Sequence, residues 1–266
     1  MDAFFKDFKV GKFIASENNL MVASIDYSGS DTEDFGMGSE LNEEYIGEKT
    51  IPLDYGSDHH GKLKFSITMV HSDSSPFTIF ETRAILRELT GKKDYTNLYF
   101  IDYEMHYDEK IHYRVKVTST ERLRVAGNID AIILYFECDS FWAYTDDMIL
   151  SLSPIANKAV LFYNSSDELN DYLYPIVEIT SDSTIQEIII TNKSDNDRQT
   201  IIKNLENTEV VILDSKNEIA TTSFNKNIID NFNLKWLRLV PGKNELVFSN
   251  DCKVKIKYTL LRKVVL

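Results

Sequence analysis

Short segments of β-forming residues, separated by turn residues, follow one another through the second half of this 266-residue chain. They are rich in β-branched and aromatic residues, and helix signals almost vanish beyond residue 147. Such a series of short strands predicts a β-sandwich. The expected strands are Lys158–Tyr163, Pro175–Ile179, Gln186–Thr191, Val210–Leu213, Trp236–Leu239, Glu245–Phe248 and Lys253–Leu260.

The first half of the chain combines strands with one helix. Residues 20–27 are expected to form a strand, and Lys62–Val70 alternates apolar with polar side chains, as in a half-buried strand. Leu98–Tyr103 and Lys110–Val117 are predicted to form a hairpin, and Ile129–Asp139 a further strand. This order predicts an α+β domain, a β-sandwich with one helix and a β-hairpin.

The helix is predicted over residues 76–89. Ser75 would be its N-cap, Pro76 its first residue, and Gly91 would end it. Its apolar residues are not confined to one stripe, so we expect it to be covered on two sides, by its own sheet and by a neighbouring subunit. The residues assigned to a subunit interface on this segment are Phe77, Ile79 and Leu86.

The fold class is therefore mainly β, with two domains. We place the boundary at about residue 148, after the turn residues 144–147, which gives an N-terminal domain over 1–148 and a C-terminal sandwich over 149–266. The second domain is expected to resemble galectins and carbohydrate-binding modules.

Residues 28–48 are unusually acidic and contain four glycines. A solvated mobile loop is one interpretation, but loops of this length within compact domains are usually functional. We therefore predict that the segment contacts another subunit or the next ring. The interface residues assigned to it are Asp31, Glu33, Asp34, Phe35, Glu40, Glu43 and Glu44.

The formal net charge of −13 lies almost entirely in the first half. Residues 1–150 contain 15 Lys+Arg and 27 Asp+Glu, whereas residues 151–266 contain 14 and 15. This balance argues against a protein that binds nucleic acid by neutralising phosphates. It is compatible with a surface along which DNA slides without binding.

The residues that could carry chemistry do not form a recognisable catalytic or metal-binding motif. The pair His59-His60 in an acidic turn, the carboxylates Asp102 and Glu104 near the hairpin, and the aspartates of residues 182–197 all lack the required spacing or partners. We therefore expect no catalytic residue, no metal and no cofactor.

Two further features indicate ordinary strand packing and a cytoplasmic origin. The alternation of Lys253, Lys255 and Lys257 with apolar residues indicates a strand with one solvent-exposed face, and Cys138 and Cys252 are expected to be buried, reduced thiols.

The N-terminus lacks the pattern of a signal peptide, and no apolar run approaches the length that spans a bilayer.

Several segments resemble the distal tail proteins of siphophages. The stretch Leu134–Tyr144 is similar to their domain boundary, although Phe141-Trp142 stands where proline is common. The C-terminal half is similar to their sandwich at Asn164, Tyr174–Ile179 and Val211–Asp214, and above all at Trp236–Asn244.

The resemblance implies a structural protein of the virion tail tip that is made in the host bacterial cytoplasm and is not an enzyme. It implies a homohexameric ring that joins the tail-tube protein to a tail-associated hub, lysin or receptor-binding protein. DNA would pass through without specific binding, and no membrane insertion is expected. The alternative is a carbohydrate-binding adhesion module in the C-terminal domain, with Tyr163, Tyr172, Tyr174 and Phe232 as candidate contacts.

Overall fold

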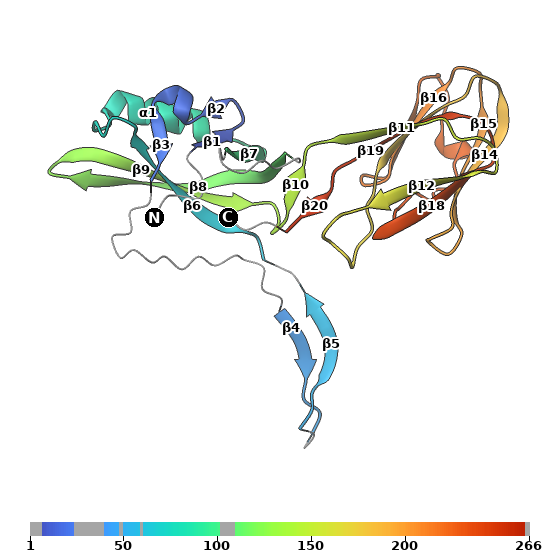
Figure 1. Cartoon of the computed structure of the whole chain (residues 1–266), viewed down its shortest axis with the longest axis horizontal. Helices are drawn as coiled ribbons and strands as arrows, with labels where there is room; N and C mark the ends of the chain where they lie inside the picture. Colours follow the sequence, from blue (N-terminus) through green and yellow to red (C-terminus); the bar gives the residue numbers. More distant parts are fainter. Residues whose placement is uncertain (1–6, 24–39, 48–49, 59–60, 102–109, 264–266) are drawn as a thin grey trace. The chain divides into compact units, whose positions relative to one another are not determined.

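The computed structural model describes residues 7–23, 40–47, 50–58, 61–101 and 110–263. The chain forms two compact units, residues 1–144 with 263–266, and residues 145–262 (Figure 1). Most described residues of both units lie in antiparallel strands and there is one α-helix, so the predicted mainly-β class is confirmed. The strand β11 (Met148–Leu152) begins at the residue where the domain boundary was predicted.

Most strands of the first unit are joined by hydrogen bonds into one sheet, with the order β2-β1-β7-β8-β9-β6-β3. The predicted alternation in residues 62–70 is confirmed, because Leu63, Ile67 and Met69 are buried whereas Lys64 is exposed. The strands are β1 (Asp7–Val10), β2 (Phe13–Ile14), β3 (Leu20–Val22), β6 (Lys64–His71), β7 (Thr96–Ile101), β8 (Ile111–Val125), β9 (Asn128–Cys138) and β10 (Ala143–Thr145), which pairs with β8.

Strands β8 and β9 form a long hairpin that the sequence analysis did not predict, since it ended the first of these strands at Val117 and treated Ile129–Asp139 as a separate strand. The polar run of residues 118–125 continues β8 and pairs with β9, with register shifts at Val117/Ser119 and Leu123/Arg124. Ala126 and Gly127 connect the strands with φ angles of 49° and 89°, as a two-residue hairpin turn requires. The predicted turn near residues 107–109 lies outside the described residues.

The helix α1 (Ile79–Leu89) begins three residues later than predicted. Thr78, not Ser75, is its N-cap, because the Thr78 hydroxyl accepts a hydrogen bond from the Glu81 backbone while the Glu81 carboxylate accepts one from the Thr78 backbone. The preceding Phe77 cannot be helical, since its backbone N–H donates to the Ile129 carbonyl at 2.7 Å and joins the segment to β9.

The second unit is the predicted sandwich of two antiparallel sheets, with the orders β11-β19-β13-β16-β17 and β12-β18-β14-β15. Apolar residues from both sheets form one core, in which Ile179, Ile188 and Phe248 are fully buried. Its further strands are β12 (Ala159–Asn164), β13 (Ile176–Thr180), β14 (Ile185–Asn192), β15 (Arg198–Leu205), β16 (Val210–Asp214), β17 (Ile219–Thr222), β18 (Gly242–Phe248), β19 (Lys253–Tyr258) and β20 (Leu261–Arg262).

The prediction of a strand over Trp236–Leu239 was wrong. Only Leu239 makes a bridge, to Leu173, while the Trp236 carbonyl accepts a hydrogen bond from the Arg198 side chain. Trp236 is buried, so its β-like apolar character reflects core packing of an irregular segment.

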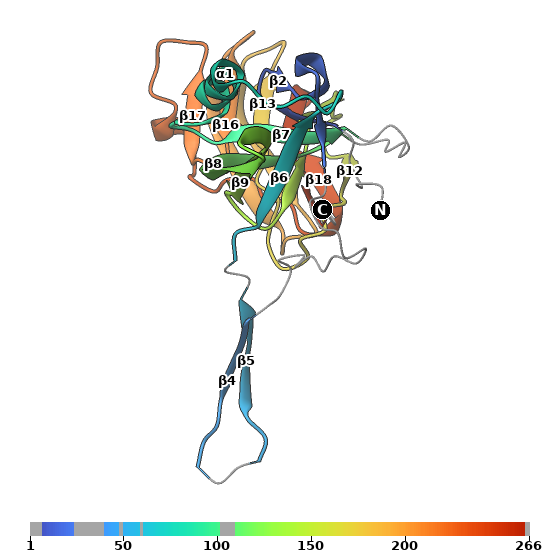
Figure 2. The ribbon, with the colours of Figure 1, turned by 90° about the vertical axis from the view of Figure 1, so that its left-hand side faces the viewer.

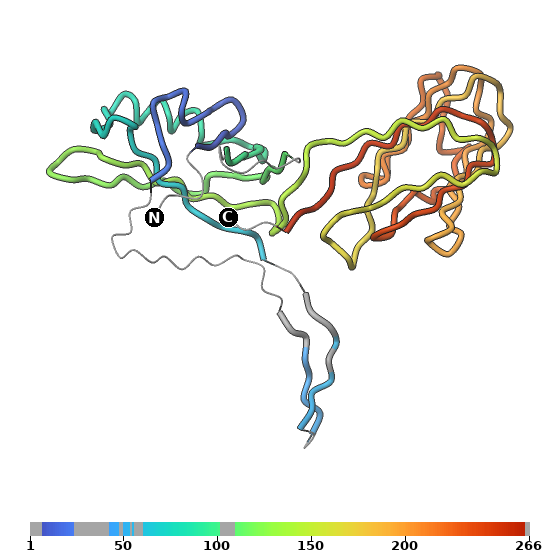
Figure 3. Tube along the Cα trace, in the orientation of Figure 1, coloured from blue at the N-terminus to red at the C-terminus, as the bar shows by residue number. Residues whose placement is uncertain are grey.

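Residues 40–44, expected in a loop, form the strand β4 (Glu40–Glu44), which pairs with β5 (Leu53–Asp58). Figures 2 and 3 show these two strands as a separate hairpin, which shares no ladder with the other sheets of the described residues. An isolated two-stranded hairpin is marginally stable in water, so this element is expected to need a partner surface.

The two cysteines are buried free thiols, as predicted. Burial raises the pKa of Cys138 to about 12 and that of Cys252 to about 11. Both thiols are therefore protonated and unreactive near neutral pH in the folded protein.

We predict that Thr78→Ala destabilises the first unit by about 1 kcal/mol, because the capping box loses its side-chain acceptor. Ser75→Ala is the matched control and should change the free energy of unfolding by less than about 0.5 kcal/mol. Urea unfolding followed by far-ultraviolet circular dichroism would measure both. Equal effects of the two substitutions would contradict the assignment of Thr78 as the cap.

Candidate functional site

The interface residues predicted near the helix have three different environments. Phe77 is only 5% exposed and packs in the core of the first unit, so its assignment to a subunit interface was wrong. Leu86 is half-buried against the same core, whereas Ile79 is 74% exposed. The neighbouring Phe80, which was not assigned to the interface, is 84% exposed.

The core side of α1 is formed by Thr82, Ile85 and Leu89, which recur with helical spacing and are buried. Ile79 and Phe80 lie outside this stripe, and nothing in the described part of the chain covers them. Two large exposed apolar residues at the start of a helix indicate a contact with another molecule.

A groove of about 500 Å³ lies between α1 and β8. Three of its residues are arginines, Arg83 and Arg87 from the helix and Arg122 from the strand, and all three are exposed. None of them forms an ion pair with a described residue, although the unit as a whole is acidic. Its lining consists of Ile79, Thr82, Arg83, Leu86, Arg87, Thr90, Thr120 and Arg122.

The β4–β5 hairpin provides the second candidate surface. Of the acidic residues predicted to contact a neighbour, Glu43 and Glu44 are exposed on β4, and Glu40 is at the start of that strand. Asp31, Glu33, Asp34 and Phe35 lie outside the described residues. The hairpin also exposes five large apolar residues that the sequence analysis did not single out, namely Tyr45, Ile46, Ile51, Leu53 and Tyr55.

Among the described residues, no three His, Cys, Asp or Glu side chains are grouped to hold a metal ion. His59, His60, Asp102 and Glu104 are outside the described residues. None of the helices in the described part of the chain has the length and apolar character needed to span a bilayer.

The lysines of β19 are paired with carboxylates, which agrees with their prediction as the wet face of a strand. Lys253 contacts Asp182 at 2.8 Å and Lys255 contacts Glu178 at 2.7 Å. Lys257 likewise lies 2.7 Å from Asp147. These contacts leave little unpaired positive charge on β19 for binding phosphates.

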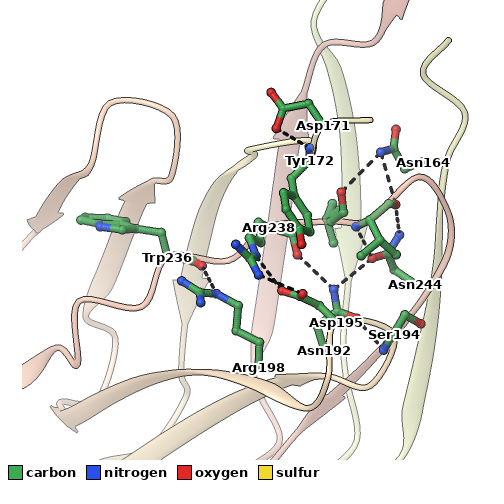
Figure 4. Close-up of polar contacts among 12 residues, drawn as sticks. Asn164, Asp171, Tyr172, Asn192, Ser194, Asp195, Arg198, Trp236, Arg238 and Asn244 are labelled. Carbon is green, nitrogen blue, oxygen red and sulfur yellow. Dashed lines mark hydrogen bonds and ion pairs between the residues drawn. The ribbon is translucent and has the colours of Figure 1, made fainter. Parts of the chain in front are cut away.

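Three asparagines hold the irregular segment 236–241, which precedes β18 in the second unit (Figure 4). The Asn244 side chain accepts a hydrogen bond from the Val240 backbone at 2.9 Å and donates to the Val240 carbonyl at 2.8 Å. Asn192 donates to Asn244 Oδ1 at 2.9 Å, and Asn164 donates to the Val240 carbonyl at 3.3 Å. The side chains thus replace the ladder that a strand would supply.

An ion pair anchors the same segment. Arg238 donates from Nε and from an Nη atom to the buried Asp195 carboxylate, at 2.7 and 3.1 Å (Figure 4). The Arg238 guanidinium also stacks on Tyr172, with Cζ 3.9 Å from the ring centroid. The hydrogen bond to Asp195 raises the pKa of Arg238 above its ordinary value, so the guanidinium stays charged.

The aromatic residues proposed for glycan binding do not share one exposed surface. Phe232 is buried against Trp236, with ring centroids 4.7 Å apart, and Tyr172 is engaged by Arg238. Tyr174 is 38% exposed, and only Tyr163, on β12, is widely exposed at 70%. Phe232 therefore packs in the core, as is usual for such a residue, and is not available as a glycan contact.

Comparisons with known proteins agree on one kind of molecule. The family model described as the phage tail protein N-terminal domain matches residues 4–140, and the one described as the phage tail C-terminal domain matches residues 142–258. A comparison with curated protein sequences gives no significant match.

Solved structures with the same fold come from phage tails. The SPP1 Dit protein, described as a paradigm of the hub adsorption apparatus in phages that infect Gram-positive bacteria, has a TM-score of 0.69 at 11% identity. The match covers 96% of this chain and 98% of that chain. A chain of the phage p2 baseplate in its activated conformation with Sr has a TM-score of 0.54 at 9% identity, covering 98% of this chain and 99% of that one.

We predict that Arg238→Ala destabilises the second unit by about 3 kcal/mol, because the buried Asp195 carboxylate loses its only ion-pair partner among the described residues. Lys253→Ala removes an exposed ion pair of the same unit and should cost about 0.5 kcal/mol. Urea unfolding followed by tryptophan fluorescence would compare them. Similar costs for both substitutions would show that the Asp195–Arg238 pair does not anchor the segment.

Proposed function

This chain belongs to the phage tail protein family, matched in both of its domains, and we propose that it is the ring-forming adaptor at the tip of a phage tail. The observation that carries the proposal is the joint match of both domain models, with a fold shared along nearly the whole chain with a hub adsorption protein. Phage tail proteins are components of the virion, and their role is structural.

In the proposed assembly, six copies form a closed ring. Residues 1–148 would make the ring, and residues 149–266 would project from it as a separate domain. Support comes from two features of the first unit, the α1–β8 groove and the β4–β5 hairpin, on which Tyr45, Ile51 and Tyr55 are exposed. Head-to-tail contacts whose rotation closes generate such rings.

The proposed partners are the tail-tube protein on one side and a tail-associated hub, lysin or receptor-binding protein on the other. The protein would be made in the cytoplasm of the host bacterium and would carry out no reaction itself. Both statements follow from its role as a structural component and agree with the sequence, which has no recognisable catalytic motif.

We predict that the purified chain forms a closed oligomer of six copies, because one protomer leaves large apolar surfaces exposed. Light scattering over a range of concentrations, or native mass spectrometry, would measure the mass. A monomer at every concentration, also in the presence of tube protein, would contradict the proposal. Together with glycan binding, that outcome would favour the adhesion-module alternative.

We also predict that ring formation strengthens between 0.01 and 0.1 M salt, and that the ring does not bind duplex DNA measurably. Residues 1–150 carry 15 Lys+Arg against 27 Asp+Glu, so copies repel one another and repel DNA in a shared channel. Salt screens this repulsion, because the screening length falls from about 30 Å to about 10 Å over that range. Sedimentation at each salt concentration and DNA titration would measure both, and tight, salt-sensitive DNA binding would contradict the electrostatic argument.

A further inference from the structure

We propose that the β4–β5 hairpin of one copy docks into the α1–β8 groove of the next copy. This inference rests on the ring assembly proposed above and identifies the two surfaces that meet. The occupant of the groove would be a second copy of this chain, because the groove and the hairpin complement each other in charge and in apolar character.

Several arginines at the groove have no ion-pair partner among the described residues. Arg83, Arg87 and Arg122 line it, and the neighbouring Arg124 also lacks an ion pair with any described residue. Glu81 closes the capping box of α1. Glu121 lies between Thr120 and Arg122 on β8, and successive residues of a strand point to opposite faces, so Glu121 points away from the groove. The exposed carboxylates of the helix are those of Glu81, in the capping box, and Glu88.

The hairpin has the opposite charge. Residues 40–58 contain six acidic residues and one lysine. Of these, Glu43 and Glu44 are exposed on β4, and neither forms an ion pair with a described residue. Glu44 accepts a hydrogen bond of 3.2 Å from the Tyr55 hydroxyl, which holds an acid and an aromatic ring on the same face of the hairpin.

Apolar residues accompany the charges on both surfaces. The groove contains Ile79 and Leu86 and lies next to Phe80, while Tyr45, Ile51 and Tyr55 of the hairpin are 66%, 78% and 63% exposed. Exposed apolar groups of this size in a two-stranded hairpin destabilise it in isolation and are stabilised by burial against another surface. Docking would bury the apolar residues of both surfaces and pair glutamates of the hairpin with arginines of the groove. Such charge pairs determine the orientation of the contact as well as its affinity.

Charge reversal tests the contact. The hairpin variant carries Glu43→Lys and Glu44→Lys, and the groove variant carries Arg83→Glu and Arg87→Glu. Either variant alone should need a protein concentration at least about tenfold higher to reach half-maximal ring assembly, because like charges would then face each other at the contact. The control for the hairpin variant carries Glu17→Lys and Asp94→Lys, and the control for the groove variant carries Lys12→Glu and Lys93→Glu. These four residues are exposed elsewhere in the first unit, so both controls should assemble as the parent chain does.

Mixing the two variants shows whether the contact joins different copies. In an equimolar mixture, the two variants can alternate around a ring with an even number of subunits. Each reversed hairpin then meets a reversed groove, and each unchanged hairpin meets an unchanged groove. Assembly should therefore return to at least half of the parent level. A chain carrying all four substitutions should also assemble. Recovery in that chain but not in the mixture would mean that each hairpin docks into its own groove, which overturns the proposal.

The other outcomes also discriminate. Rings that are unaffected by either reversal would overturn this contact and leave the ring proposal intact. A parent chain that never assembles would contradict the ring proposal itself, and the contact with it. If the groove variant changes only binding of added DNA or of tube protein, those molecules occupy the groove, and the proposal is wrong. Thermal unfolding of every variant confirms that it is folded.

Discussion

Strand β9 is the element on which the first unit depends. It pairs with β8 along one edge and with β6 along the other, and its residues Ile132, Leu134 and Phe136 are almost completely buried. Its first buried residue, Ile129, also holds the segment before α1 through the hydrogen bond from Phe77. The helix, the extension of β8 and therefore the groove between them owe their positions to this one strand.

The sequence predicted what simple periodicity encodes. Alternating apolar and polar residues identified β6 and β19, because each of these strands buries one face and exposes or half-exposes the other. The strand β9 was identified by its β-branched and aromatic residues. The start of α1 was misplaced because Ser75 and Pro76 look like a helix start, whereas the backbone hydrogen bond of Phe77 to β9 keeps that segment extended. The apolar residues near Trp236 were assigned to a strand, although side-chain hydrogen bonds hold that segment.

The candidate interface was predicted in part. Acidic residues of β4 and the exposed Ile79 were identified, but the polar sequence of residues 118–125 gave no sign that it continues a strand and forms one wall of a groove. Pairing of β4 with β5 depends on a distant segment, which residue type alone does not reveal. Phe77 was assigned to the interface because a helical geometry placed it on the surface, whereas the sheet buries it.

Taken together, these features describe a protein with different tasks in its two units. The second unit is a closed sandwich whose irregular segment is fastened by the asparagine cluster and the Asp195–Arg238 pair. The first unit leaves two surfaces of opposite charge exposed, which suits head-to-tail assembly into a ring. A reconstruction of the assembled chain by electron cryo-microscopy tests this account most directly. The account predicts a closed ring of six first units, with each β4–β5 hairpin in the α1–β8 groove of its neighbour; open filaments, or a ring in which those grooves face solvent, would contradict it.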